Sequence, residues 1–190
     1  MAVVVVSGSG RKVGKTAVGC ALIRALPDWQ WAAVKVTPHA HGREDGIYEE
    51  WEGDSEKDTG RYLAAGAKRS FLVSCEDGAR ATELVVGLRQ QMNECDALLI
   101  ESNRIELGDV AERGEPRLGI AVVGGATAEW KASLCERLAS MDALVLSGGV
   151  SLEGLAIDLS ERPVFPVAVG EWASSELVSF VRDHCSRGLR

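Results

Sequence analysis

Short apolar runs and amphipathic stretches alternate along the whole 190-residue chain. The apolar runs are rich in Val, Leu and Ile without polar alternation, which is typical of strands that are covered on both faces. They lie at 3–6, 31–36, 71–73, 97–100, 118–123, 143–146 and 164–169. Stretches with helical periodicity lie at 15–26, 59–67, 79–93, 129–140 and 174–185. Because strands that alternate with helices form βαβ units, the pattern predicts an α/β fold, doubly wound, with a mostly parallel sheet.

Composition limits the size, the partners and the location of the protein. The chain has 190 residues, of which 46% are hydrophobic, so it is large enough for one domain with its own core. Residues 1–190 are therefore expected to form a single domain. The net charge of -7 argues against nucleic acid or an anionic membrane as a main partner. No apolar run approaches the about 18 residues of a membrane span, and no basic segment precedes the run at 2–6. The expected location is the cytoplasm.

The cysteines are widely scattered and include no C-x-x-C pair. This usage predicts reduced thiols, most of them small core residues, rather than a disulfide framework or a zinc site. The five residues are Cys20, Cys75, Cys95, Cys135 and Cys185.

A glycine-rich segment lies between the first apolar run and the first helical stretch. It reads Ser7-Gly8-Ser9-Gly10-Arg11-Lys12-Val13-Gly14-Lys15-Thr16. Between a strand and a helix, the backbone N–H groups of such a loop converge on an anion, and the helix dipole adds to the attraction. We therefore expect a P-loop that binds a nucleoside triphosphate, with Lys15 reaching the β and γ phosphates and Thr16 ligating Mg²⁺. The expected nucleotide-binding residues are Gly8, Ser9, Gly10, Arg11, Lys12, Val13, Gly14, Lys15 and Thr16.

Two acidic residues are candidates for completing the magnesium site. Glu101 directly follows the apolar run at 97–100, where a strand is expected to reach the ligand-binding edge of the sheet. The alternative for Glu101 is an ordinary exposed acid at a strand end. Asp58 is the second candidate, and it also fits the N-cap of the helical stretch that follows it. The expected metal ligands are Thr16, Glu101 and Asp58.

Lys35 lies near the end of the second apolar run. A buried ammonium group needs a partner or a ligand, so Lys35 would suit a second phosphate or a substrate carboxylate. With Lys15 and Glu101 it forms the expected catalytic set. His39 and His41 follow closely, and their role stays open between a metal site, a polar lining and no function.

Two segments interrupt the alternation of strands and helices, at 37–57 and 102–117. The first carries seven acidic against two basic residues, which is most of the excess negative charge of the chain. Segments of this length without periodicity are predicted to be loops, either functional or simply solvated.

Four features resemble, in this order, the MobB-type proteins of molybdopterin-guanine dinucleotide biosynthesis. They are the P-loop, Lys35 with the histidines after it, the stretch from Asp58 to Ala67, and the run from Asp96 to Glu101. This resemblance implies a GTP-binding adaptor of the P-loop NTPase type, commonly a homodimer, which hydrolyses GTP slowly and acts with a partner protein in molybdenum cofactor biosynthesis.

The spacing within the P-loop is similar to a different family, dethiobiotin synthetase. Five residues separate Gly8 from Gly14, one more than in the usual form. Dethiobiotin synthetase also has a strand-end Lys comparable to Lys35 and a metal-binding acid comparable to Glu101. This second resemblance implies an ATP-dependent ligase acting on a small carboxylate or carbamate. No guanine-specific Asn-Lys-x-Asp follows the run at 143–146, so the choice between GTP and ATP stays open.

Overall fold

Eight strands form one sheet in the part of the chain that the computed structural model describes, residues 1–38, 44–124, 138, 140–150, 162–168 and 170–186. The strands are β1 (Ala2–Gly8), β2 (Trp31–Thr37), β3 (Gly46–Glu50), β4 (Arg69–Ser74), β5 (Ala97–Glu101), β6 (Arg117–Val123), β7 (Ala143–Leu146) and β8 (Val164–Pro166). Their order is β3-β4-β2-β5-β1-β6-β7-β8. Neighbours are parallel except for β3 and β4, which are antiparallel. The predicted mostly parallel α/β sheet is confirmed.

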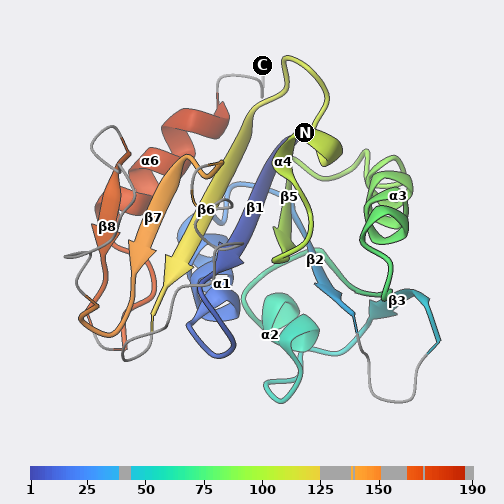
Figure 1. Cartoon of the computed structure of the whole chain (residues 1–190), viewed down its shortest axis with the longest axis horizontal. Coiled ribbons are helices and arrows are strands. Elements are labelled where there is room, and N and C mark those ends of the chain that lie inside the picture. The colour runs from blue at the N-terminus through green and yellow to red at the C-terminus, as the bar shows by residue number, and fades with distance from the viewer. Residues whose placement is uncertain (39–43, 125–137, 139, 151–161, 169, 187–190) are drawn as a thin grey trace.

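Helices cover both faces of this sheet, as Figure 1 shows. They are α1 (Lys15–Ala25), α2 (Asp58–Ala64), α3 (Gly78–Arg89), α4 (Leu107–Val110) and α6 (Ser175–Cys185). Side chains of α1, α2 and α6 pack in one core cluster, and those of α3 and α4 pack in another on the opposite face. The helix predicted at 129–140 lies outside the described residues, apart from 138 and 140.

Burial on both faces explains why the strands are continuously apolar. In β1, Val4 and Val6 belong to the core cluster with α1, whereas Val3 and Val5 belong to the cluster with α3. All four side chains are fully buried, and each such burial stabilises the fold by about 1.5–3 kcal/mol. The same alternation continues through β5, so every second residue faces the same helix layer.

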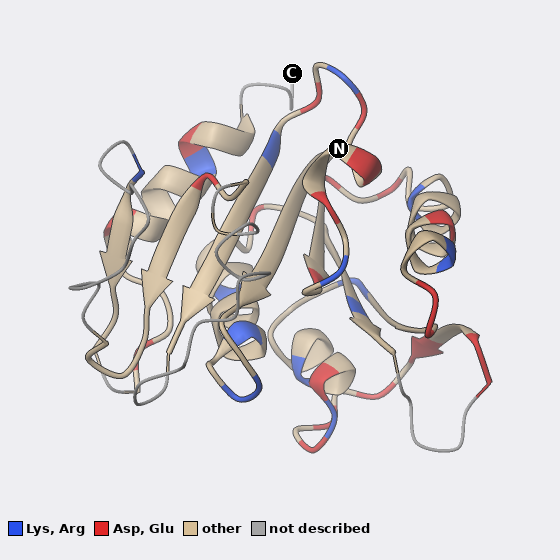
Figure 2. Cartoon of the chain, in the orientation of Figure 1, with Lys and Arg blue, Asp and Glu red and all other residues tan. Residues whose placement is uncertain are grey.

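The position of β1 determines where a ligand can bind. β1 lies between β5 and β6, and residues 31–101 build the sheet on one side of it while residues 117–166 build the other. Chain connections diverge at such a point and leave a crevice beyond the carboxyl ends of the strands, where ligands bind in α/β folds. The loop that follows β1 lies at this edge, and Figure 2 shows it as a basic segment.

The predicted loop at 37–57 contains an edge strand, so the prediction was wrong for Gly46–Glu50. This strand has a neighbour on one side only, and its charged residues hide the hydrophobic pattern that would have indicated it. Glu49 forms an ion pair with Arg69 of β4 at 2.8 Å, which strengthens the strand pairing. A short helix, α4, likewise lies in the segment predicted as a loop at 102–117.

Cysteine burial agrees with the prediction in the described residues. The thiols of Cys20, Cys75, Cys95 and Cys185 are free and buried, and Cys135 lies outside the described residues. Burial raises the pKa of the Cys185 thiol to about 12. None of the helices in the described ranges combines the length and the apolar character that crossing a bilayer requires.

Candidate functional site

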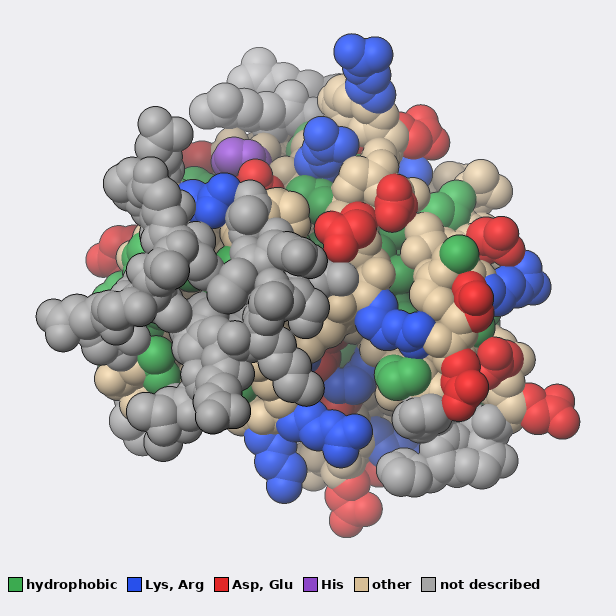
Figure 3. All heavy atoms as spheres, in the orientation of Figure 1, with side chains coloured by type: hydrophobic (Ala, Val, Ile, Leu, Met, Phe, Trp, Pro, Cys, Tyr) green, Lys and Arg blue, Asp and Glu red, His purple; other side chains and the backbone are tan. Residues whose placement is uncertain are grey.

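A cavity of about 810 Å³ opens at the carboxyl ends of β1, β2 and β5. The P-loop, the first residues of α2 and the segment after β5 line it, together with Trp172 from the segment before α6. In Figure 3, Lys and Arg side chains gather at the lower edge of the molecule, where Figure 1 places the P-loop. The cavity is therefore suited to an anionic ligand.

Two residues of the P-loop have a left-handed backbone conformation. Lys12 has φ 58° and Gly14 has φ 104°, a conformation that costs little only for glycine. Lys15 folds back across the loop, and its Nζ donates a hydrogen bond to the carbonyl oxygen of Gly10 at 2.7 Å. Burial lowers the pKa of Lys15, although the nearby Glu101 carboxylate opposes the shift.

Side chains that follow two other strands, β5 and β7, bind the two ends of the loop. The Asn103 amide, just after β5, accepts from the Gly8 N–H at 2.9 Å and donates to the Gly8 carbonyl oxygen at 3.1 Å. At the other end, the Ser147 hydroxyl donates to the Val13 carbonyl oxygen at 2.8 Å. The loop therefore has its shape set by residues on both sides of β1.

Glu101 is the central acceptor of the site and is only 3% exposed. It lies opposite Lys35 in the parallel pairing of β5 with β2, so both side chains point to the face that carries α1 and α2. Its Oε1 accepts from Lys35 Nζ at 2.7 Å, and its Oε2 accepts from Thr16 Oγ1 at 2.7 Å. The structure thus brings Thr16, Lys35 and Glu101 together as the sequence predicts, and the alternative of an exposed strand-end acid is wrong.

Asp58 lies beside this group and is not the N-cap of α2. The N-cap position is held by Lys57, and Asp58 instead forms an ion pair with Lys35, its Oδ2 lying 2.6 Å from Nζ. Arg61 contacts the other carboxylate oxygen at 3.3 Å. Burial opposes ionisation of Asp58, but the hydrogen bond and charge of Lys35, together with Thr16 and Arg61, outweigh it and lower the pKa of the carboxyl. Burial likewise opposes the charge on Lys35, and Glu101 and Asp58 overcome it and raise its pKa.

Tyr62 is a residue of the candidate site that the sequence analysis misses. Its side chain is fully buried, and its hydroxyl donates to Glu101 Oε2 at 2.6 Å. Gly19 of α1 makes room for it, because a Cβ at that position would lie 3.0 Å from the Tyr62 ring. Burial holds the pKa of Tyr62 well above its usual value, so the hydroxyl stays a donor. The one sequence signal is its spacing from Asp58, since residues four apart share a helix face.

The oxygen atoms of the site fit a magnesium ion that is held by few protein ligands. In the described residues, no group of three or more His, Cys, Asp and Glu side chains could hold a metal by itself. Mg²⁺ usually takes one or two protein carboxylates and completes its shell with water and phosphate oxygens. Thr16 and Glu101 supply such oxygens, and the three hydrogen bonds to Glu101 use three of the about four acceptor positions of a carboxylate.

His39 and His41, whose role the sequence leaves open, lie outside the described residues. Two other residues of the site had no sequence signal, Asn103 and Trp172, because each acts on a segment far away along the chain.

Comparisons with known proteins give a weak likeness to a solved structure. No family model matches the chain, and no curated protein matches its sequence. Among solved structures, it is similar to the MobB protein homolog from Bacillus stearothermophilus, with 21% sequence identity, 86% of each chain covered and a TM-score of 0.40. That name agrees with the MobB-type resemblance seen in the sequence. The fold class rests on the order and direction of the strands and does not depend on this likeness.

Proposed function

We propose that the protein binds a nucleoside triphosphate with Mg²⁺ in the cavity at the carboxyl edge of the sheet. The observation that carries this proposal is the convergence of Lys15, Thr16 and Glu101 at the end of β1, on a loop that opens into a helix. Backbone N–H groups in such a loop bind phosphate oxygens, and the N-terminus of α1 adds a favourable dipole.

Each of the charged residues has a part in this proposal. Lys15 would exchange the Gly10 carbonyl oxygen for a phosphate oxygen. Thr16 and Glu101 would hold Mg²⁺, with Asp58 as a further candidate, and the bound ion supplies positive charge next to the phosphates. Lys35 keeps both carboxylates in place and adds positive charge at the same end of the cavity.

Within this class, we propose a MobB-like accessory role in molybdenum cofactor (molybdopterin guanine dinucleotide) biosynthesis. The support is the sequence resemblance at the P-loop, at Lys57-Asp58-Thr59-Gly60-Arg61 and at the run that ends in Glu101. In this role the nucleotide is GTP, hydrolysis is slow, and a cytoplasmic homodimer meets a partner protein of cofactor biosynthesis.

A ligase of the dethiobiotin synthetase type is the second candidate, and the extent of the cavity favours it. Beyond the P-loop, the cavity is also lined by Lys35, Arg61 and Arg104. These cations would suit the carboxylate of a second substrate, which ATP would activate.

Calorimetric titration with Mg-GTP and Mg-ATP, each repeated with EDTA, tests the shared part of the proposal. Binding at micromolar concentrations that weakens without Mg²⁺ is the expected result, and no binding of either nucleotide at millimolar concentration would contradict it. Phosphate release then separates the two candidates. Slow release that no added carboxylate or carbamate accelerates supports the accessory role, whereas a substrate-dependent burst supports the ligase.

A further inference from the structure

The indole of Trp172 reaches the P-loop from the far end of the chain. Trp172 lies between β8 and Ser174, the N-cap of α6. Its six-membered ring comes so close to Gly14 that a Cβ on this glycine would lie 2.2 Å from Cζ3 of the indole. Gly14 is thus the residue that lets an aromatic ring lie against the phosphate-binding loop.

Trp172 is packed on one side and borders the cavity on the other. It packs against the core cluster that α1 and α6 share, and its side chain is only partly buried. It also lines the cavity, and among the described lining residues it is the only aromatic one. Partial burial of a large, flat side chain at a cavity wall leaves an apolar face available to a ligand.

Lys35 with Glu101 and the segment of Trp172 come from opposite halves of the sheet. Lys35 and Glu101 belong to β2 and β5 on one side, whereas Trp172 follows β8, whose strand lies on the other side. A triphosphate bound with its terminal phosphates near Glu101 and Thr16 would then have room for its nucleoside toward Trp172. The side of the cavity left for the base is the one that Trp172 borders.

We propose that Trp172 binds the nucleotide base by stacking, and that it makes the site selective for purine over pyrimidine nucleotides. The inference rests on the proposed nucleotide binding and adds the residue that recognises the base. Aromatic side chains stack on any base, and the larger face of a purine gains more contact than that of a pyrimidine. Discrimination between GTP and ATP is not expected from this contact alone, because stacking does not read hydrogen-bonding edges.

Comparing a nucleotide with inorganic tripolyphosphate separates base binding from phosphate binding. Both ligands, with Mg²⁺, are titrated into wild type, Trp172→Ala and Trp172→Phe. Removing the indole should lower the affinity for ATP and GTP by about 5- to 100-fold, the range of one base–aromatic stack. The affinity for tripolyphosphate should stay within about two-fold. The nucleotide affinity of the Phe variant should lie between those of wild type and the Ala variant. The Ala substitution should lower the affinity for CTP less than the affinity for ATP.

Trp51 offers a matched control, because it is 80% exposed and follows β3 at the edge of the sheet. Trp51→Ala should leave all affinities unchanged. Should Trp172→Ala fail to fold, the tryptophan fluorescence of wild type and Trp172→Phe gives a second readout. Purine nucleotides should quench wild-type emission, tripolyphosphate should not, and the Phe variant should lose the quenching.

The outcomes that overturn the inference differ from those that overturn the function. If wild type binds tripolyphosphate and nucleotides but Trp172→Ala changes neither, or weakens both equally, then Trp172 does not bind the base and nucleotide binding stands. If wild type binds neither ligand, the proposed function fails, and the inference with it.

Discussion

The two ends of the sheet each carry a cavity, and the two cavities are built from different kinds of residue. The cavity at the carboxyl ends of the strands has a volume of about 810 Å³ and is lined in part by the buried polar side chains of Thr16, Glu101 and Ser102. A cavity at the other end has about 510 Å³ and is lined by residues that lead into β6 and β7, by α4 and by His184 of α6. All of its lining residues are at least partly exposed.

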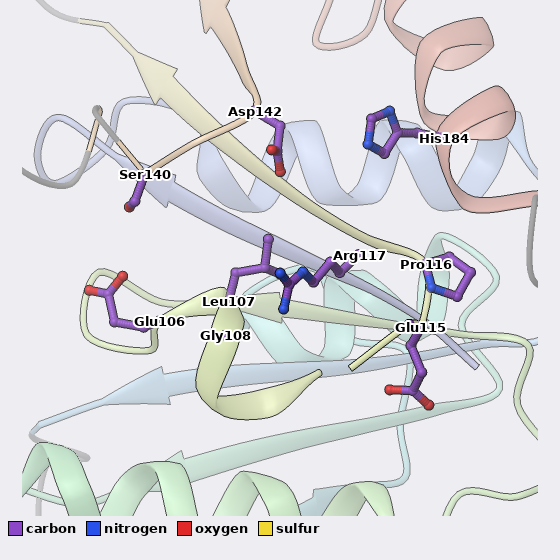
Figure 4. Close-up of a pocket in the computed structure, with 10 residues that line it drawn as sticks. Glu106, Leu107, Gly108, Glu115, Pro116, Arg117, Ser140, Asp142 and His184 are labelled. Carbon is purple, nitrogen blue, oxygen red and sulfur yellow. The ribbon is translucent and has the colours of Figure 1, made fainter. Parts of the chain in front are cut away.

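Polar groups in the second cavity mostly stabilise loops. Asp142 accepts a hydrogen bond from the Gly119 N–H at 2.7 Å, and Glu115 pairs with Arg89 of α3. The His184 ring lies against Phe180, 5.2 Å between centroids. Figure 4 shows Glu106 and Glu115 well separated, so the acids do not converge on one point. Nothing in this set of side chains is arranged around a common ligand.

The difference favours mutually paired charges around a buried carboxylate, rather than cavity shape, as the indicator of a site. A buried ion pair is often no more stabilising than apolar side chains of the same volume, so the ion pair of the buried Glu101 with Lys35 is weak evidence for a role in folding alone. Chains depart from the best choice for stability mainly at functional positions. The comparison therefore supports the proposed binding site at the carboxyl edge.

The largest effect is expected from removing the lysine of the P-loop. Lys15→Ala should weaken triphosphate binding by at least about 100-fold, because it removes charge-assisted hydrogen bonds to phosphate. Arg117→Ala removes a cation from the other cavity and is the matched control, with unchanged binding. Calorimetry measures both. Equal losses in the two variants would mean that general charge, rather than this cavity, attracts the nucleotide.

A smaller effect is expected at the carboxylate next to Thr16. Glu101→Gln should leave binding without metal nearly unchanged and should remove most of the tightening by Mg²⁺, about ten-fold, because an amide oxygen is a much weaker magnesium ligand. Glu115→Gln, in the other cavity, should keep the full magnesium effect. If Glu101→Gln keeps it as well, Asp58 is the metal ligand instead.

The buried tyrosine should contribute to stability through its hydrogen bond to Glu101. Tyr62→Phe should lower the free energy of unfolding by about 1–2 kcal/mol, because it removes one hydrogen bond to the buried carboxylate of Glu101. The hydrogen bonds from Thr16 and Lys35 to Glu101 remain. The control is Tyr48→Phe, whose hydroxyl donates to the Glu44 carbonyl oxygen at an exposed position, with a loss below about 0.5 kcal/mol. Urea unfolding at neutral pH measures both, and equal losses would mean that Glu101 does not depend on Tyr62.

The smallest effect is a pH dependence that originates at Asp58. Its pKa in the folded chain is lowered from 3.8, because Lys35, Thr16 and Arg61 together outweigh the effect of burial. The stabilisation from this shift is therefore complete above about pH 3.8 and is lost as the pH falls through the lower folded value. The difference in unfolding free energy between wild type and Asp58→Asn should shrink below pH 3.8. A difference that stays constant over this range would show that the ion pair does not lower the pKa.

The sequence predicts those parts of the molecule that depend on local pattern. The alternating runs predict seven strands of the sheet, and the position of Lys35 and Glu101 at strand ends predicts that they meet. Strand β3 was missed because an edge strand needs little apolar pattern. Tyr62 and Trp172 were missed for another reason, since each acquires its role only when α2, or the segment before α6, packs beside the P-loop. Local periodicity does not predict such long-range contacts, and it gives only the four-residue spacing of Tyr62 from Asp58.

A crystal structure of the protein with Mg²⁺ and a non-hydrolysable nucleoside triphosphate tests the central claim most directly. We expect the phosphates on the backbone of residues 8–16, the metal next to Thr16 and Glu101, and the base against Trp172. Nucleotide density in the cavity beside Arg117 and His184, or a P-loop left free at ligand concentrations that saturate binding in solution, would contradict the assignment.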